Sequence, residues 1–169
     1  SPGSLSVLST GAFTVSGNSA LTGILDLGPS VYTATGSTTI SGSGSLTDGN
    51  DAGSNTFTGL ITLSSATASF TSANASPYSF AGGVTNAGSL NLSGTGTVTF
   101  NNSQTIAGAG SLQMQNFTVP ATRVLTISAT GTKSVSGNVI NAGTITHSAA
   151  SGTLSIADTL NNSGTITGG

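Results

Sequence analysis

The sequence has no cysteine, no tryptophan and no glutamate, and its 169 residues include only four Asp, one Lys and one Arg. Without cysteine, neither disulfides nor thiolate metal sites can form. Two basic residues cannot make the positive patch that binds nucleic acid or anionic membranes. No apolar run approaches the roughly 18 residues of a membrane span. We therefore expect no nucleic-acid partner and no membrane insertion.

Small polar residues dominate what is present: 29 Ser, 29 Thr and 25 Gly. Such a composition, with almost no charge, is typical of bacterial surface proteins and unlike that of cytosolic enzymes. The chain starts at Ser1 and shows no signal peptide, so we expect a processed N-terminus. These features predict a secreted protein, located outside the cell or on its surface.

One motif recurs along the chain: an apolar residue, any residue, Asn or Gly, any residue, Gly, Ser or Thr, then Leu or Ile. Five copies run over 40–46, 84–90, 106–112, 139–145 and 160–166. Their first residues are separated by 44, 22, 33 and 21 positions, so the unit is near 22 residues, with a half-unit inserted in places. A fixed period of this length indicates a repeat architecture.

Between the motif copies, apolar residues alternate with polar ones, as in Leu90-Asn91-Leu92 and Leu154-Ser155-Ile156. A period of two is the spacing of a β-strand with one buried face. Nowhere is the spacing of an amphipathic helix sustained, so we expect no helix. The fold class is predicted as all-β: a single-domain parallel β-solenoid over residues 1–169, with seven or eight rungs. Irregular rungs or loops are expected around 47–83 and 113–138.

The motif assigns structural roles. Its apolar ends are expected to form the core repeat: Ile40, Leu46, Val84, Leu90, Ile106, Leu112, Val139, Ile145, Leu160 and Ile166. Leu90, Leu112, Ile145 and Ile166 should lie in one axial stack. The turn and ladder positions are Asn86, Gly88, Gly110, Asn141, Gly143, Asn162 and Gly164. Here glycine would supply a left-handed or tight turn, and asparagines would stack between rungs.

Residues able to carry chemistry are few and dispersed. Asp26, Asp158, Arg123 and Lys133 are interpreted as exposed charges, and His147 as a residue at a rung edge. No catalytic motif occurs, so the chain is predicted not to be an enzyme, with no catalytic residue and no cofactor. The one local cluster is Asp48, Asp51 and Asn55, whose oxygen ligands in a glycine-containing loop make it a weak calcium candidate.

Threonine pairs of the form Thr-x-Thr include those at 33/35, 56/58, 97/99, 144/146 and 165/167. A flat threonine array could organise ice-like water. Since the pairs are unevenly spaced, we expect no regular array, and ice binding is a minor alternative.

The runs Asn141-Ala-Gly-Thr-Ile145, Asn162-Ser-Gly-Thr-Ile166 and Gly88-Ser-Leu-Asn-Leu-Ser-Gly94 resemble the repeats of bacterial autotransporter passengers and filamentous-haemagglutinin-type adhesins. The resemblance covers most of 40–50 and 82–169. It implies a right-handed β-helix displayed on, or released from, the bacterial surface. It carries over no catalytic motif.

Neither end of the predicted solenoid carries a polar cap. Leu5 and Val7 begin the apolar pattern, and Thr165, Ile166 and Thr167 complete it. We therefore expect these residues to assemble copies of the chain head to tail, as the structural subunit of an extracellular filament whose partner is itself. The alternative is a stalk or passenger segment of a surface adhesin that binds a glycan or a host protein.

Overall fold

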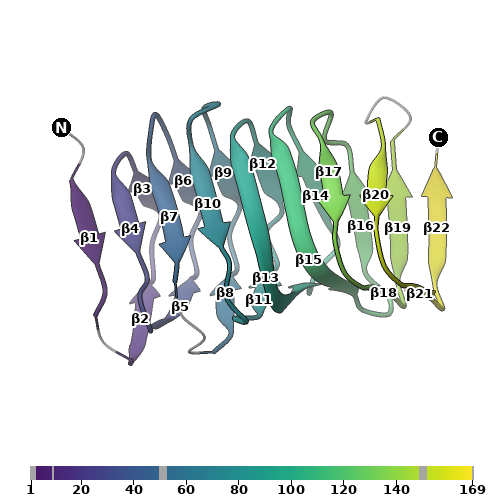
Figure 1. The fold of residues 1–169 in the computed structure, drawn as a ribbon, viewed down its shortest axis with the longest axis horizontal. Coiled ribbons are helices and arrows are strands. Elements are labelled where there is room, and N and C mark those ends of the chain that lie inside the picture. Colours follow the sequence, from purple (N-terminus) through teal and green to yellow (C-terminus); the bar gives the residue numbers. More distant parts are fainter. Residues whose placement is uncertain (1–2, 9, 50–52, 149–151, 169) are drawn as a thin grey trace.

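A computed structural model describes residues 3–8, 10–49, 53–148 and 152–168. The chain is an all-β parallel solenoid of about 8 turns with about 21 residues per turn, as predicted (Figure 1). The described residues form strands and turns, without a helix.

Each turn contributes one strand to each of three columns, which we call faces I, II and III. Face I contains β1 (Ser4–Ser6), β4 (Ile24–Asp26), β7 (Ser45–Asp48), β10 (Ser69–Ser72), the first parts of β13 (Ser89–Phe100) and β15 (Ser111–Val119), β17 (Lys133–Val135) and β20 (Leu154–Ile156). Face II contains β2 (Ala12–Val15), β5 (Val31–Ala34), β8 (Asn55–Phe57), β11 (Tyr78–Phe80), the second parts of β13 and β15, β18 (Val139–Asn141) and β21 (Leu160–Asn162). Face III contains β3 (Ser19–Leu21), β6 (Thr38–Ile40), β9 (Ile61–Leu63), β12 (Val84–Asn86), β14 (Gln104–Ala107), β16 (Val124–Ile127), β19 (Thr144–His147) and β22 (Thr165–Gly168).

Successive turns pair in parallel, and β13 and β15 run without a break from face I into face II. The segments 47–83 and 113–138 lack the sequence motif. They nevertheless hold strands in register with their neighbours, such as β10 with β7 and β15 with β17. Extra residues are accommodated in the corners between faces, so turn length varies while the register is kept.

Alternation along each strand separates the core from the surface. Eight of the ten core-repeat residues are buried, whereas Leu160 and Ile166 in the last described turn are 44% and 42% exposed. The core is thin, because each turn supplies only one or two inward side chains to each face. Stacking eight turns joins these side chains into one continuous cluster.

An aromatic column runs through the core. Phe13, Tyr32, Phe57, Phe80, Phe100 and Phe117 follow one another in six successive turns, with ring centroids 5.3–6.1 Å apart. Phe70 and Tyr78 pack beside it. All eight aromatic residues of the chain therefore lie in one connected group. Tilted and edge-on ring pairs add stabilisation beyond the area that they bury.

The prediction of a single aliphatic stack is wrong. Leu90 pairs with Leu112 on face I, whereas Ile145 pairs with Ile166 on face III. In its first three copies the motif crosses the corner from face III to face I, and in its last two the corner from face II to face III. The same seven-residue motif therefore occurs at two different corners of the coil.

The left-handed conformation considered for the motif glycine is not found. Gly88, Gly110, Gly143 and Gly164 are absent from the residues with positive φ. Instead, each corner lies too close to the turn below for a side chain: a Cβ on Gly110 would be 2.3 Å from the carbonyl oxygen of Gly88. The motif requires glycine because turns stack closely at these corners.

Candidate functional site

Asp48 is the centre of a buried polar cluster at the corner between faces I and II. It is 3% exposed. Its Oδ2 accepts hydrogen bonds from Asn55 Nδ2 at 2.6 Å and from the Tyr78 hydroxyl at 2.5 Å, and its Oδ1 accepts one from Asn74 Nδ2 at 3.0 Å. Asn55 Oδ1 in turn accepts the backbone N–H of Tyr32. The cluster thereby joins β5, β7, β8 and β11.

This geometry opposes the calcium candidate. Asn55 presents its amide N–H, not its oxygen, to Asp48, and both carboxylate oxygens already accept hydrogen bonds from neutral donors. A calcium ion requires several oxygen ligands directed at one point. Asp51 lies outside the described residues. Among the residues that are described, no group of three His or Asp side chains is placed to hold a metal ion.

Burial changes the acid–base properties of two tyrosines. Desolvation, reinforced by the hydrogen bond to Asp48, raises the pKa of Tyr78 above its ordinary value of 10.0. Desolvation likewise raises the pKa of Tyr32. Both phenols are therefore held in their protonated form in the folded chain.

The interpretation of Lys133 as a surface charge is wrong. Its side chain is 1% exposed and occupies an inward position of face I between Leu112 and Leu154. Its Nζ donates to the carbonyl oxygens of Ala129 at 2.7 Å and Gly131 at 2.9 Å, and so closes the corner before β17. Burial lowers the pKa of Lys133.

The other titratable residues lie apart from one another. Arg123 and Asp158 are exposed, as expected. His147 ends β19 at an inward position between Ile127 and Gly168, and its Nε2 is buried without a hydrogen-bond partner among the described residues. Asp26 accepts the Gly28 N–H at 3.1 Å. That none of these residues catalyses a reaction stays a prediction.

The asparagine ladder is short. Asn141 Nδ2 donates to Asn162 Oδ1 at 2.7 Å, so these two residues stack in adjacent turns of face II. Asn86 lies on face III and makes different bonds: its Nδ2 donates to the Ser111 carbonyl, and its Oδ1 accepts the Gly88 N–H. Asn86 stabilises a corner and is not part of an asparagine ladder.

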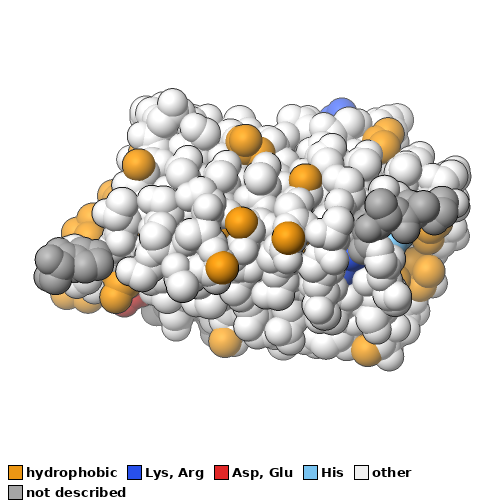
Figure 2. All heavy atoms as spheres, turned by 90° about the horizontal axis from the view of Figure 1, so that it is seen from above, with side chains coloured by type: hydrophobic (Ala, Val, Ile, Leu, Met, Phe, Trp, Pro, Cys, Tyr) orange, Lys and Arg blue, Asp and Glu red, His pale blue; other side chains and the backbone are white. Residues whose placement is uncertain are grey.

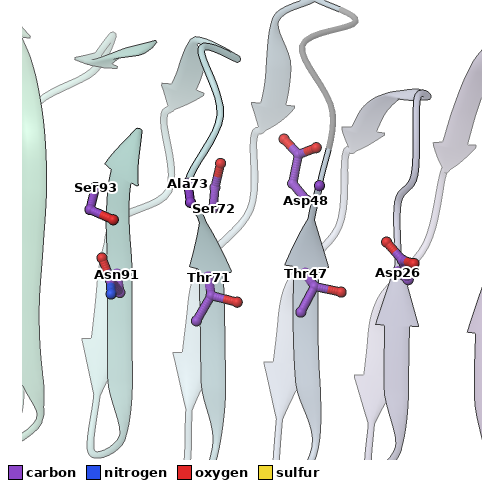
Figure 3. Close-up of a pocket in the computed structure, with 9 residues that line it drawn as sticks. Asp26, Thr47, Asp48, Thr71, Ser72, Ala73, Asn91 and Ser93 are labelled. Carbon is purple, nitrogen blue, oxygen red and sulfur yellow. The ribbon is translucent and has the colours of Figure 1, made fainter. Parts of the chain in front are cut away.

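A shallow groove of about 360 Å³ lies along face I, parallel to the solenoid axis (Figure 3). Four outward residues in direct register form its length: Asp26, Thr47, Thr71 and Asn91. The strand ends above them complete the lining with Asp48, Gly49, Ser72, Ala73 and Ser93. The sequence signal for such a row is an outward polar residue in each of four successive turns.

The two end layers of the described solenoid expose apolar side chains of the core columns, whereas the exposed Leu60, Val124 and Ile140 lie singly on its sides. Figure 2 shows hydrophobic side chains gathered at both ends of an otherwise largely polar rod. At the first turn Leu5 is 56% exposed, and at the last turn Leu160 and Ile166 are 44% and 42% exposed. Of the predicted assembly residues, Leu5, Thr165, Ile166 and Thr167 are exposed and Val7 is half-buried.

Threonines align more than their sequence spacing indicates. Thr105, Thr126, Thr146 and Thr167 form one outward column on face III, in direct register. The next column contains Val124 beside Thr144, so the threonine surface is narrow. Ice binding stays a prediction.

Comparison with protein-family models, with curated proteins and with solved structures finds no match for this chain. The description of the fold therefore rests on the repeats of the sequence and on the structure. Of the residues that the structure describes, none belongs to a helix long and apolar enough to cross a membrane.

Proposed function

We propose that this chain is a structural unit of an extracellular filament, in which copies stack head to tail and continue the solenoid. The observation that carries the proposal is the pair of open end layers. The first described turn presents β1, β2 and β3, and the last presents β20, β21 and β22, each without a partner strand on its outer side among the described residues. Because every strand pair is parallel, the last turn of one copy meets the first turn of another with matching strand direction.

Backbone hydrogen bonding supports this stacking. The Thr165 N–H donates to the Gly143 carbonyl oxygen in the turn below. Since alternate residues of a parallel strand bond to opposite neighbours, the N–H of Ile166 faces away from the molecule. Unpaired edges of this kind readily accept another strand.

The apolar positions are also complementary. Leu154 ends the inward column of face I that begins with Leu5, so a second copy would place these two leucines in contact. On face II, Phe13 likewise begins an inward column and Leu160 ends it, so these two residues would also come into contact. A contact between two different ends of the same chain does not close on itself and therefore propagates.

The extracellular setting rests on composition and on the resemblance of the repeats to autotransporter passengers and haemagglutinin-like adhesins. The chain has six charged residues in all, and two of them, Asp48 and Lys133, are buried. A surface made mainly of hydroxyl and amide groups is suited to a structural rod outside the cell. Axial contacts made of backbone hydrogen bonds and apolar side chains are insensitive to salt.

Sedimentation velocity over a concentration series, with electron microscopy of the same samples, tests this proposal. We expect unmodified protein to form rods that lengthen with concentration. The variant Ile166→Pro with Leu160→Lys removes the outward N–H and places a charge in the end layer. It should remain monomeric, because its native hydrogen bonds to the turn below are kept.

The matched control is Ile140→Lys. Ile140 is 47% exposed, a fraction similar to the 44% of Leu160. Its side chain, however, points outward and lies one turn before the end layer. This variant adds the same charge and should still assemble. If unmodified protein is monomeric at high concentration, the filament proposal fails. The chain is then better explained as a segment of an adhesin, whose neighbouring turns belong to the same molecule.

A further inference from the structure

The groove on face I has an unusual composition for this molecule. Its floor is the row Asp26, Thr47, Thr71 and Asn91, which joins four successive turns. Neighbouring strands lie about 4.8 Å apart, so three steps give a row roughly 14 Å long. In Figure 3 the four side chains follow one another along the axis, with Ser93, Ser72 and Asp48 at the strand ends above them.

The row offers hydrogen-bonding groups that the protein itself does not fully use. The Asn91 Oδ1 atom is buried and has no hydrogen-bond partner among the described residues, so Asn91 offers a ligand its amide N–H groups. The half-buried Asp26 accepts one backbone N–H through Oδ1. Thr47 and Thr71 add hydroxyls that can both donate and accept. Asp48 is different, because its carboxylate is directed into its own cluster.

This chemistry excludes several ligand classes. The lining has no Lys, Arg or His, so an anion finds no positive partner. A cation would find one uncommitted carboxylate, that of Asp26, because the Asp48 carboxylate is occupied by hydrogen bonds within its own cluster. Asn91 lies three strand spacings from Asp26 and cannot share an ion with it. A planar apolar ligand needs aromatic or aliphatic walls, and Ala73 is the one apolar side chain in the lining of this groove.

We propose that the groove binds a neutral linear oligosaccharide, laid along the solenoid axis. Sugar hydroxyls both donate and accept, which matches a row of hydroxyl, amide and carboxylate groups. An extended chain of sugar rings can address several turns in succession, whereas a single small polyol would reach one or two. Because no aromatic ring is available for stacking, each site binds weakly. The inference concerns the side of a single copy and does not depend on axial assembly.

A titration followed by ¹⁵N–¹H correlation spectra tests this inference. The probes are cellohexaose and maltohexaose, with calcium chloride and spermine as cationic comparisons. They are added to about 20 mM, where a millimolar complex is mostly formed. We expect one of the two oligosaccharides to shift the amide signals of the groove residues and their neighbours on β4, β7, β10 and β13. Asn91→Leu should weaken that binding about fivefold, the effect of one lost hydrogen bond.

The matched control is Ser155→Ala. Ser155 continues the same outward row of face I through Ser134 but lies outside the groove, so its removal should leave the affinity unchanged. Circular dichroism of each variant verifies that the fold is kept. Absence of shifts with both oligosaccharides overturns the proposal, as does equal binding by the Asn91→Leu variant. Binding of calcium or spermine alone, lost in Asp26→Asn, would replace it with a cation site.

Discussion

Replacing Gly110 by alanine tests the close stacking of turns at the corners. An added Cβ would lie 2.3 Å from the Gly88 carbonyl oxygen and 2.7 Å from Asn86 Oδ1, where ordinary contacts begin at 3.4 Å. The corner would have to move by about 1 Å, which disrupts three hydrogen bonds. These are Gly110 N–H to the Asn86 carbonyl (2.8 Å), Ser111 N–H to the Gly88 carbonyl (2.9 Å) and Asn86 Nδ2 to the Ser111 carbonyl (2.6 Å).

Each lost hydrogen bond costs about 1 kcal/mol, and overpacking adds about 1–3 kcal/mol if the bonds are partly kept. We expect Gly110→Ala to lower the free energy of unfolding by roughly 3–5 kcal/mol. Urea unfolding followed by far-ultraviolet circular dichroism measures this change. Monomeric protein is required, so the end-capped variant Ile166→Pro with Leu160→Lys serves as the background.

Two other glycines separate steric from conformational effects. A Cβ on Gly17 meets nothing within 4 Å, so Gly17→Ala should change stability by less than about 0.5 kcal/mol. Gly42 is equally open but has φ +58°, so alanine there should cost about 1–2 kcal/mol. If Gly110→Ala matches Gly17→Ala in stability, the turns do not stack as described.

Three further predictions concern the buried polar groups and one strained turn. Asp48→Ala leaves three donors without their acceptor and should lower the free energy of unfolding by about 3–5 kcal/mol; a loss below 1 kcal/mol would contradict the cluster. Since the folded pKa values of Tyr78 and Tyr32 are raised, the stability that they contribute is complete below pH 10. It should fall above that pH by about 1.4 kcal/mol per pH unit for each tyrosine, with a shallower slope in Tyr78→Phe. Lys133 has the opposite effect: because its folded pKa is lowered, its contribution to stability rises with pH until its unfolded pKa of 10.5 is reached. Urea titrations from pH 9 to 11.5 should therefore show the loss of stability caused by the tyrosines most clearly above pH 10.5. Thr122 has φ 67°, so Thr122→Gly should raise the urea midpoint, by about 0.5–1 kcal/mol in stability, and a lower midpoint would contradict the strain.

Alternation was the reliable guide to the fold. It predicted the strands, the absence of helix and the burial of Leu90 and Leu112, because a period of two records which face of a strand is covered. The same alternation places Asp48 two residues after Leu46, and Lys133 two residues before Val135, on the inward side. Both residues were assigned to the surface or to a loop because of their charge. The partners that satisfy them come from other turns, which the sequence does not bring together.

The motif itself was ambiguous. Two corners of the coil have the same steric requirement: each has a position with no room for a Cβ, which only glycine can occupy. The same motif therefore occurs at both corners. Aligning the motif copies with one another therefore gave Leu112 and Ile145 equivalent positions, although they lie on different faces. The aromatic column was missed for a related reason: its members recur at uneven intervals, because the corners differ in length.

Disulfide trapping between copies tests the central claim, the axial continuation of the solenoid, most directly. The chain has no cysteine, so Leu5→Cys with Leu154→Cys introduces one thiol in each end layer. In a continued ladder the two residues become register partners about 4.8 Å apart, within the roughly 4.4–6.8 Å that a disulfide spans. Oxidation should then give a ladder of covalent multimers on a non-reducing gel, whereas Leu154→Cys with Val15→Cys, on different faces, should give few. Equal yields from the two pairs, or monomer alone from the first, would contradict head-to-tail stacking.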